Sequence, residues 1–201
     1  MGDLIRVAQS ADVEAVTAVL GAAFADDPVM SWAFADDVRP KRLQAMWRFM
    51  SGEGYVPKGT STVIGDGSIA DAAALWLAPG VELTDEEFWT PRLEGFVEVM
   101  EGDVERLAAV SEAMGAVHPS EPHWYLLAIG VDPARHGGGL GSALLAHTLA
   151  RADAEGAPAY LEASSTRSRA LYERFGFEVA EEFCAEGGPP LWAMWREPSA
   201  G

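Results

Sequence analysis

The chain has 201 residues, of which 31 are acidic and 14 are basic, so its formal net charge is −17 at pH 7. This length fits a single domain over residues 1–201. The strong negative charge argues against nucleic acid as a partner, because affinity for nucleic acid comes mainly from Lys and Arg side chains that neutralise phosphates.

Other features of the composition indicate a soluble cytoplasmic protein. Cys184 is the single cysteine, which excludes an internal disulfide and suits a reducing compartment, and we expect it to be buried in a strand. The first residues lack the pattern of a signal peptide, and no apolar run is long enough to span a membrane. The four histidines are scattered and form no metal-binding signature, so we expect no metal.

The N-terminal part reads as a strand followed by two helices. Residues 4–7 alternate as in a first or edge strand, and Ser10 is the expected N-cap of a helix that runs to about Phe24. The residues at 26–28, Asp-Asp-Pro, predict a turn, and a second helix is expected over residues 40–51.

A hairpin and a long helical region follow. Residues 52–59 read as a loop, and residues 61–64 and 72–77 read as two strands joined across Gly-Asp-Gly. Residues 84–87 have the form of a capping box, which opens a helical region to about residue 115 with a break near Gly102. Pro91 falls inside this region, where proline shortens or kinks a helix.

The stretch His-Gly-Gly-Gly-Leu-Gly-Ser at residues 136–142 lies between an apolar strand, residues 124–131, and a leucine-rich helix. Glycines there allow a phosphate oxygen to approach backbone N–H groups, and the N-terminus of the helix adds a partial positive charge. The loop therefore predicts a phosphate site that needs no lysine. By itself it is equally compatible with a flexible turn that caps a helix.

A second informative segment, residues 161–177, reads as a short strand, a loop, one or two helical turns and a Gly-Phe turn. The strands at 124–131 and 160–163 are joined by a helix, so they are expected to be parallel neighbours with a right-handed crossover. By the two-residue period of a strand, His123 and Tyr125 point to one face of the sheet and Trp124 points to the other.

These two segments resemble the acyl-CoA-binding core of the GNAT N-acetyltransferases, in which a glycine loop precedes a helix and Leu-Tyr-x-x-x-Gly-Phe follows. Glu-Pro-His-Trp-Tyr-Leu at 121–126, Tyr-Glu-Arg-Phe-Gly-Phe at 172–177 and Gly-Pro-Pro-Leu-Trp at 188–192 narrow the resemblance to the puromycin N-acetyltransferases. The chain departs from that pattern at His136, where Gln or Arg is usual, and at Ser168, where Asn is usual.

The resemblance implies an α/β (α+β) fold of the GNAT acyl-CoA N-acyltransferase type. Its mixed central sheet is flanked by helices, with splayed parallel strands in the middle. The co-substrate would be acetyl-CoA, the acceptor a small-molecule amine, and the protein a monomer or homodimer. The residues expected to hold the CoA are Ile129, Gly130, Val131, Gly137, Gly138, Gly139, Leu140, Gly141, Ser142 and Ser168.

The catalytic residues implied are an acid and a base. Tyr172 matches the position at which many GNAT enzymes place the acid that protonates the departing thiolate, although it could simply pack on the sheet. His123 is the candidate base because histidine titrates in the useful range, and a water chain to Glu162 is an equal alternative.

The acceptor expected is a partly aromatic aminoacyl molecule, such as a puromycin-like antibiotic, held by Asp27, Trp32, Tyr125 and Trp192. Aromatic side chains would bury a flat group, and a carboxylate at their edge would attract an ammonium. Any one of these aromatics could instead belong to the core.

Two other classes compete with this interpretation. A dinucleotide-binding oxidoreductase would also use a glycine loop with a glutamate about twenty residues later, but the Gly-x-Gly-x-x-Gly spacing of that class is not met. The Walker A pattern of nucleotide-binding loops is not met either. A non-catalytic acyl-CoA sensor is kept open by the residues at 136 and 168.

Overall fold

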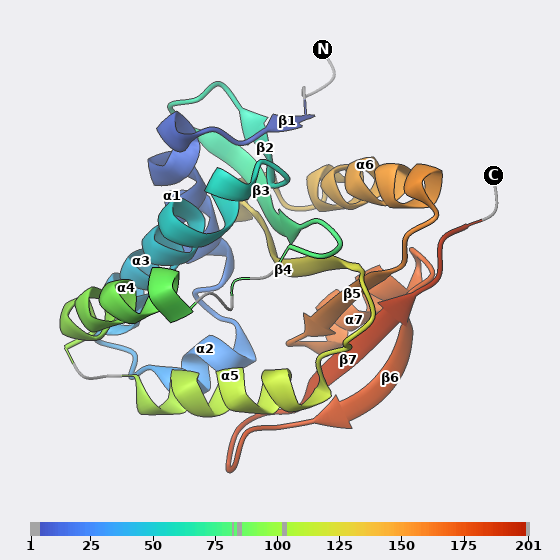
Figure 1. The fold of residues 1–201 in the computed structure, drawn as a ribbon. Coiled ribbons are helices and arrows are strands. Elements are labelled where there is room, and N and C mark those ends of the chain that lie inside the picture. The colour runs from blue at the N-terminus through green and yellow to red at the C-terminus, as the bar shows by residue number, and fades with distance from the viewer. Residues whose placement is uncertain (1–4, 82, 84–85, 102–103, 200–201) are drawn as a thin grey trace.

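The structure, a computed structural model, describes residues 5–81, 83, 86–101 and 104–199 (Figure 1). Seven strands form one mixed sheet in the order β1-β2-β3-β4-β5-β7-β6, in which β4 and β5 are parallel and the other pairs are antiparallel. The predicted mixed sheet with parallel strands at its middle is confirmed. The strands are β1 (Ile5–Val7), β2 (Thr62–Gly65), β3 (Ala70–Leu77), β4 (Trp124–Val131), β5 (Ala159–Ala163), β6 (Glu178–Phe183) and β7 (Leu191–Arg196).

Helices cover both faces of this sheet. The α-helices are α1 (Val13–Ala23), α2 (Pro28–Ala33), α3 (Arg39–Phe49), α4 (Glu86–Val99), α5 (Glu105–Val117), α6 (Leu140–Glu155) and α7 (Thr166–Glu173). The side chains of β3 alternate between two cores: Ala73 and Leu75 pack with α1 and α3, whereas Ala74 and Trp76 pack with α6 and α7. This alternation places α1 and α3 on one face and α6 on the other, as Figure 1 shows.

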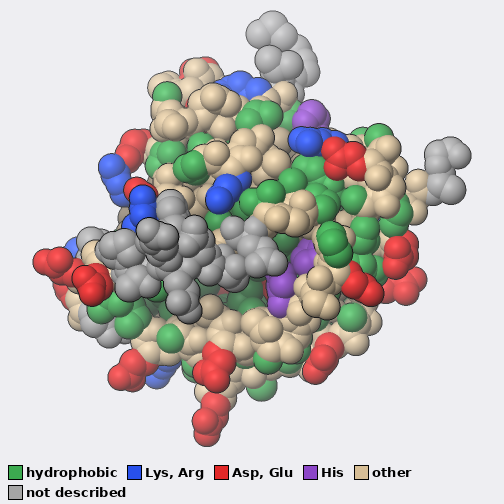
Figure 2. Space-filling view, viewed as in Figure 1, with side chains coloured by type: hydrophobic (Ala, Val, Ile, Leu, Met, Phe, Trp, Pro, Cys, Tyr) green, Lys and Arg blue, Asp and Glu red, His purple; other side chains and the backbone are tan. Residues whose placement is uncertain are grey.

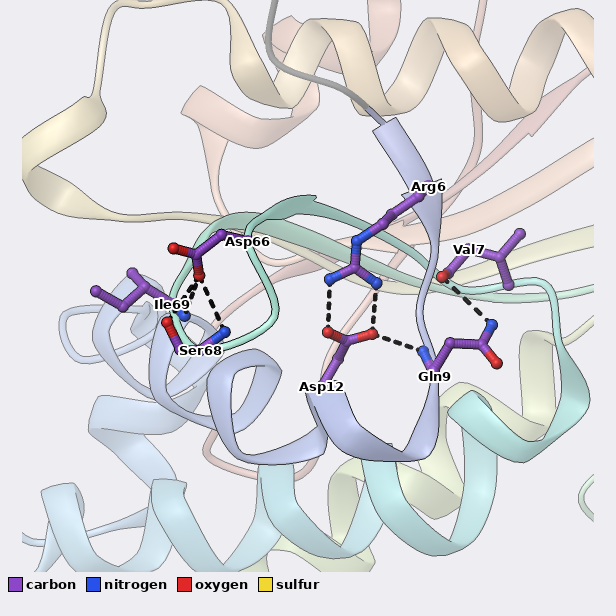
Figure 3. Close-up of polar contacts among 7 residues, drawn as sticks. All are labelled: Arg6, Val7, Gln9, Asp12, Asp66, Ser68 and Ile69. Carbon is purple, nitrogen blue, oxygen red and sulfur yellow. Dashed lines mark hydrogen bonds and ion pairs between the residues drawn. The ribbon is translucent and has the colours of Figure 1, made fainter.

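An ion pair fixes the start of the chain against α1. Both terminal nitrogens of Arg6 donate to the buried Asp12 carboxylate at 2.6 Å, and the Gln9 backbone N–H donates to it at 2.8 Å (Figure 3). The Arg6 guanidinium lowers the pKa of Asp12. The expected N-cap, Ser10, lies instead inside a 3₁₀ turn, Ser10–Asp12, because the Asp12 carboxylate takes the capping role.

The predicted hairpin between β2 and β3 is confirmed. Its turn is closed by Asp66, whose Oδ1 accepts from the backbone N–H groups of Ser68 at 3.0 Å and Ile69 at 3.1 Å (Figure 3). Side chain to backbone bonds of this kind are the usual reason for aspartate in a turn.

Two elements near the cleft differ from the prediction. The six-residue helix α2 was not expected; Asp27 caps it and Pro28 occupies its first turn. The expected loop at 52–59 is wrong, because α3 continues as a π-helical turn, Met50–Tyr55, and a 3₁₀ turn, Val56–Lys58. The wider π turn places Met50 and Tyr55 in the cleft lining.

The long helical region divides as predicted, because α4 ends at Val99 and α5 begins at Glu105; Gly102, where the break was expected, lies outside the described residues. Pro91 lies within α4 without ending it. The expected capping box at 84–87 begins outside the described residues. No helix in the described part of the chain is both long and apolar enough to cross a membrane.

Strand β4 contains a bulge at Leu127. Its partners on β3 step from Leu75 opposite Ala128 to Trp76 opposite Leu126, so Leu127 is left over. Beyond this bulge the alternation is reversed: Ala128 packs with the α1 core, and Ile129 packs with the α6 core.

The predicted burial of Cys184 is wrong. The residue follows the end of β6, and its side chain is exposed. Strand β6 is the last strand of the sheet, and its residues 178–182 are exposed as well.

Candidate active site

The parallel strands separate at the bulge of β4. Their last pairs join Tyr125 to Tyr160 and Leu126 to Leu161, and residues 128–131 pair with β3 alone among the described strands. Backbone groups of β4 on its β5 side are therefore left for a ligand, as expected for the amides of a pantetheine arm.

A cleft of about 1640 Å³ opens at this fork. It runs as one space from the glycine loop, past the ends of β4 and β5, to a chamber between α1, α3, α4 and α5. In Figure 2, histidine side chains border a hollow among hydrophobic groups, and the acidic side chains of this view lie mainly around the periphery.

The glycine loop forms one end of the cleft. Gly137 and Gly139 have φ of 81° and 79°, which disfavours any other residue, and Gly139 is followed directly by α6. The first N–H groups of a helix have no partner within it, so they are available to an anion at this end.

Most of the residues predicted to hold CoA line this space. Gly138 is not among the lining residues, and a β-carbon on it would lie 3.3 Å from the Arg135 carbonyl oxygen. The residues that do line the cleft are Ile129, Gly130, Val131, Gly137, Gly139, Leu140, Gly141, Ser142 and Ser168.

Two of these residues have a structural role as well. A β-carbon on Gly130 would lie 2.9 Å from side-chain atoms of Ala23 and Leu20, so this glycine permits close packing of α1 on the sheet. Ser168 caps α7 reciprocally with Ser165: each backbone N–H donates to the other residue's hydroxyl, at 3.1 and 3.2 Å.

Tyr172 lies on α7 and lines the middle of the cleft, although only 6% of its surface is exposed. Burial, together with the negative charge of Asp27, raises its pKa well above the ordinary value for tyrosine. The phenol therefore stays protonated at neutral pH and can donate to a leaving thiolate.

Asp27 also lines the cleft, but its carboxylate is already occupied. Its Oδ1 accepts from the backbone N–H groups of Val29 and Met30, at 2.9 and 3.2 Å, and its Oδ2 accepts from the Ser164 hydroxyl. Asp27 thus joins α2 to the segment after β5, which fixes the wall of the cleft next to Tyr172.

A buried glutamate lies at the fork itself. Glu162 projects from β5, with only 2% of its side chain exposed, and accepts a 2.9 Å hydrogen bond from the Tyr125 hydroxyl. His118 Nδ1 lies 3.6 Å from the other oxygen of the same carboxylate. These three residues line the cleft.

His123 does not line the cleft, unlike Glu162, Tyr125 and His118. Its ring is 6.3 Å from that of Tyr125, centroid to centroid, and its Nδ1 lies 2.6 Å from the Glu121 carbonyl oxygen. Burial lowers the pKa of His123, so the ring is neutral at neutral pH.

The chamber beyond Glu162 is apolar. Flexible methionines and aromatic rings dominate it, and such a mixture adapts to a flat ligand. They include Phe24, Met30, Met46, Trp47, Met50 and Phe96.

Trp32 and Trp192 are not among the residues that line this chamber. Trp32 is half-buried, and the Arg106 guanidinium lies 5.3 Å from the centroid of its ring. In the register of β5 and β7, Trp192 is opposite Ala163 whereas Ala193 is opposite Glu162. Trp192 therefore faces the α6 core, where it packs with that cluster.

Trp192→Ala should consequently lower the free energy of unfolding by about 3–5 kcal/mol, because it removes a buried indole and leaves a cavity. The kcat/KM of the folded fraction should change little. Denaturant titration, with turnover measured well below the new midpoint, checks both expectations. Trp32→Ala is the comparison variant, and it should lose less stability because the Trp32 ring is only half-buried. If kcat/KM fell more than tenfold in either variant without a loss of stability, that tryptophan would be assigned to the acceptor site.

The sequence offered Glu162 as an equal alternative to His123 for the base, and it did not single out His118 or Tyr55. One signal was present, because Glu162 is the single charged residue in an apolar strand. The approach of His118 and Tyr55 could not be foreseen, since they reach the fork from elements 44 and 107 residues away along the chain.

The fold and cleft define an acyltransferase that uses a CoA thioester. Comparison with known proteins agrees: the model of the acetyltransferase (GNAT) family matches residues 70–177. The chain belongs to the GNAT acetyltransferase family, whose enzymes use acetyl-CoA.

Individual relatives extend this likeness over the whole chain. One solved structure is described as histone acetyltransferase HPA2 and related acetyltransferase, from Corynebacterium glutamicum. Its sequence is 31% identical to this chain, its TM-score is 0.75, and the match covers 100% of this chain and 99% of that one. An uncharacterised N-acetyltransferase of Schizosaccharomyces pombe is 24% identical, over 94% of this chain and 81% of that protein. The structure of arylalkylamine N-acetyltransferase 2 from Aedes aegypti shares the fold, with 15% identity, a TM-score of 0.60 and coverage of 98% and 99%.

Proposed function

We propose that this enzyme transfers the acetyl group of acetyl-CoA to the primary amine of a small, partly aromatic aminoacyl molecule, with puromycin-like compounds first among the candidates. The observation that carries this proposal is the continuity of the cleft. One space joins the glycine loop, the Tyr172 phenol and an apolar chamber with a buried carboxylate at its entrance.

The chemistry follows from this order of groups. The loop residues Gly137–Ser142 would hold the pyrophosphate, and the free edge of β4 would pair with the pantetheine amides. The thioester would then lie at the fork, where the amine attacks its carbonyl carbon. Tyr172 would protonate the departing sulfur.

The lining of the chamber supports an acceptor with an apolar or aromatic group. Phe24, Trp47 and Phe96 present rings, while Glu162 presents a negative charge at one side. A polyamine or aminoglycoside would need many polar partners, whereas the described residues that line the chamber beyond Glu162 are mainly apolar. In the cell, such an activity would inactivate an aminoacyl-nucleoside antibiotic in the cytoplasm, and one chain supplies every group the proposal uses.

A thiol-release screen with acetyl-CoA tests the proposal. The acceptors are puromycin, aromatic amino-acid amides, spermidine, kanamycin and peptides with a free N-terminus. We expect the highest kcat/KM for the first two. Turnover of spermidine or kanamycin, with none for any aromatic amine, would contradict the substrate class.

A further inference from the structure

One carboxylate oxygen at the fork is buried without a hydrogen bond. Among the described residues no donor bonds to Glu162 Oε1, although Oε2 accepts from Tyr125 at 2.9 Å. A buried carboxylate with an unused acceptor is costly unless a ligand satisfies it, and Glu162 lines the cleft. The free oxygen therefore indicates a donor on the bound substrate.

The position of Glu162 suits the attacking nitrogen. It is the first residue after Leu161, which forms the last pair between β5 and β4, so it lies where the strands separate. Tyr172 lines the same space. An amine held at Glu162 would lie next to the carbonyl carbon of a thioester placed at the fork.

His118 gives this carboxylate a route to solvent. Its Nδ1 is 3.6 Å from Glu162 Oε1, while 35% of its own side chain is exposed. Its ring is held by Tyr125 and Tyr160, with centroids 4.8 and 5.0 Å away. An imidazole in this place can carry a proton from a buried carboxyl to water.

We propose that Glu162 receives the acceptor as an ammonium ion and removes its proton, and that His118 delivers this proton to solvent. The inference rests on the proposed function and deepens it: the substrate is bound in its charged form, and the neutral nucleophile is produced inside the cleft.

The protons balance as follows. The ammonium R–NH₃⁺ gives one proton to the Glu162 carboxylate, which passes it through His118 to water. The nitrogen lone pair forms the C–N bond, and the C–S electron pair leaves with sulfur. Tyr172 protonates this thiolate and regains a proton from the nitrogen, so the products are the amide, free CoA thiol and one released proton.

Tyr55, Tyr125, Tyr160 and His123, which lie around Glu162, are neutral at pH 7. Burial and the negative charge of Glu162 raise the pKa values of Tyr55, Tyr125 and Tyr160, and burial lowers the pKa of His123. Glu162 is thus the carboxylate in this group that attracts a cation. An acceptor with its own carboxylate beside the amine, such as a free amino acid, is disfavoured by like-charge repulsion.

The pH profile of kcat/KM for Glu162→Gln is the decisive experiment, because glutamine keeps the size and the bond from Tyr125 but cannot take a proton. Two aromatic acceptors are compared, phenethylamine with an amine pKa of about 10 and phenylalaninamide of about 8. At pH 7 we expect a loss of about 1000-fold for the first and about tenfold for the second, because the variant depends on the neutral fraction already present.

The kcat/KM of the variant should rise with pH up to the pKa of each acceptor. The kcat/KM of the unaltered enzyme should level off at a pH below that pKa. Affinity for acetyl-CoA, measured by calorimetry, should change less than threefold. Glu178→Gln on the exposed edge strand β6 is the matched control and should behave like the unaltered enzyme.

His118→Ala provides a second measurement, at a position whose side chain is 35% exposed. We expect a loss of about tenfold at pH 7 that added imidazole restores, which a structural role would not produce. Identical pH profiles in Glu162→Gln and the unaltered enzyme, or no rescue of His118→Ala, would overturn the inference while the acetyltransferase activity stands. An unaltered protein that acetylates no amine would overturn the proposed function itself.

Discussion

Tyr172→Phe should lower kcat by about 10²–10⁴-fold, because it keeps the ring but removes the hydroxyl that we propose protonates the departing thiolate. The substitution should leave folding intact, since the ring still packs on Phe177, whose centroid is 6.0 Å away. Single-turnover thiol release, which isolates the chemical step, is the measurement.

Affinity for acetyl-CoA serves as the control for Tyr172→Phe and should stay within about threefold, as the phenol acts on the transition state rather than on the bound ligand. A loss of less than about fivefold, with chemistry shown to limit the rate, would assign Tyr172 to packing. The raised pKa of the phenol adds a second expectation. The activity that depends on it should not fall between pH 7 and 9, because the acid form persists throughout this range.

Gly139→Val should weaken acetyl-CoA binding by at least about 100-fold. Gly139 has φ of 79° at the start of α6, so valine both strains the turn and obstructs the backbone N–H groups that would face the pyrophosphate. Calorimetric titration of the folded variant with acetyl-CoA gives the affinity directly.

The same helix supplies a matched control. Gly156 ends α6 with φ of 64°, and a β-carbon on either glycine would meet no heavy atom within 4 Å. Gly156→Val should therefore cost a similar amount of stability, about 1–3 kcal/mol, without any loss of affinity. Equal affinities in the two variants would show that the loop does not bind the phosphates.

Local patterns in the sequence were sufficient to predict the centre of the fold. Two-residue alternation, glycine turns and a leucine-rich helix are encoded by neighbouring residues, so the β2–β3 hairpin and the β4–α6–β5 unit could be predicted. The six-residue α2 was missed because it is too short for a periodic pattern, and Asp27 with Pro28 also describes a simple turn.

The acceptor side was harder to predict because it depends on register and on distant contacts. The bulge at Leu127 reverses the alternation of β4, and the pairing of Ala163 with Trp192 turns that tryptophan toward the core. The role of Asp27 changes for a similar reason, since Ser164, 137 residues away, occupies its second oxygen. This is why we propose Glu162, rather than Asp27, as the carboxylate that receives a cation.

In the proposed reaction, one cleft carries the acetyl group from CoA at the glycine loop to an amine at the fork. A crystal structure with a bisubstrate analogue, in which an acetyl spacer joins the CoA sulfur to the nitrogen of phenylalaninamide, tests it most directly. We expect the pyrophosphate at Gly137–Ser142, the sulfur within hydrogen-bonding reach of Tyr172, the nitrogen beside Glu162 and the phenyl ring among the methionines. An analogue whose pyrophosphate lies away from the loop, or whose phenyl ring lies outside the chamber, would contradict the account.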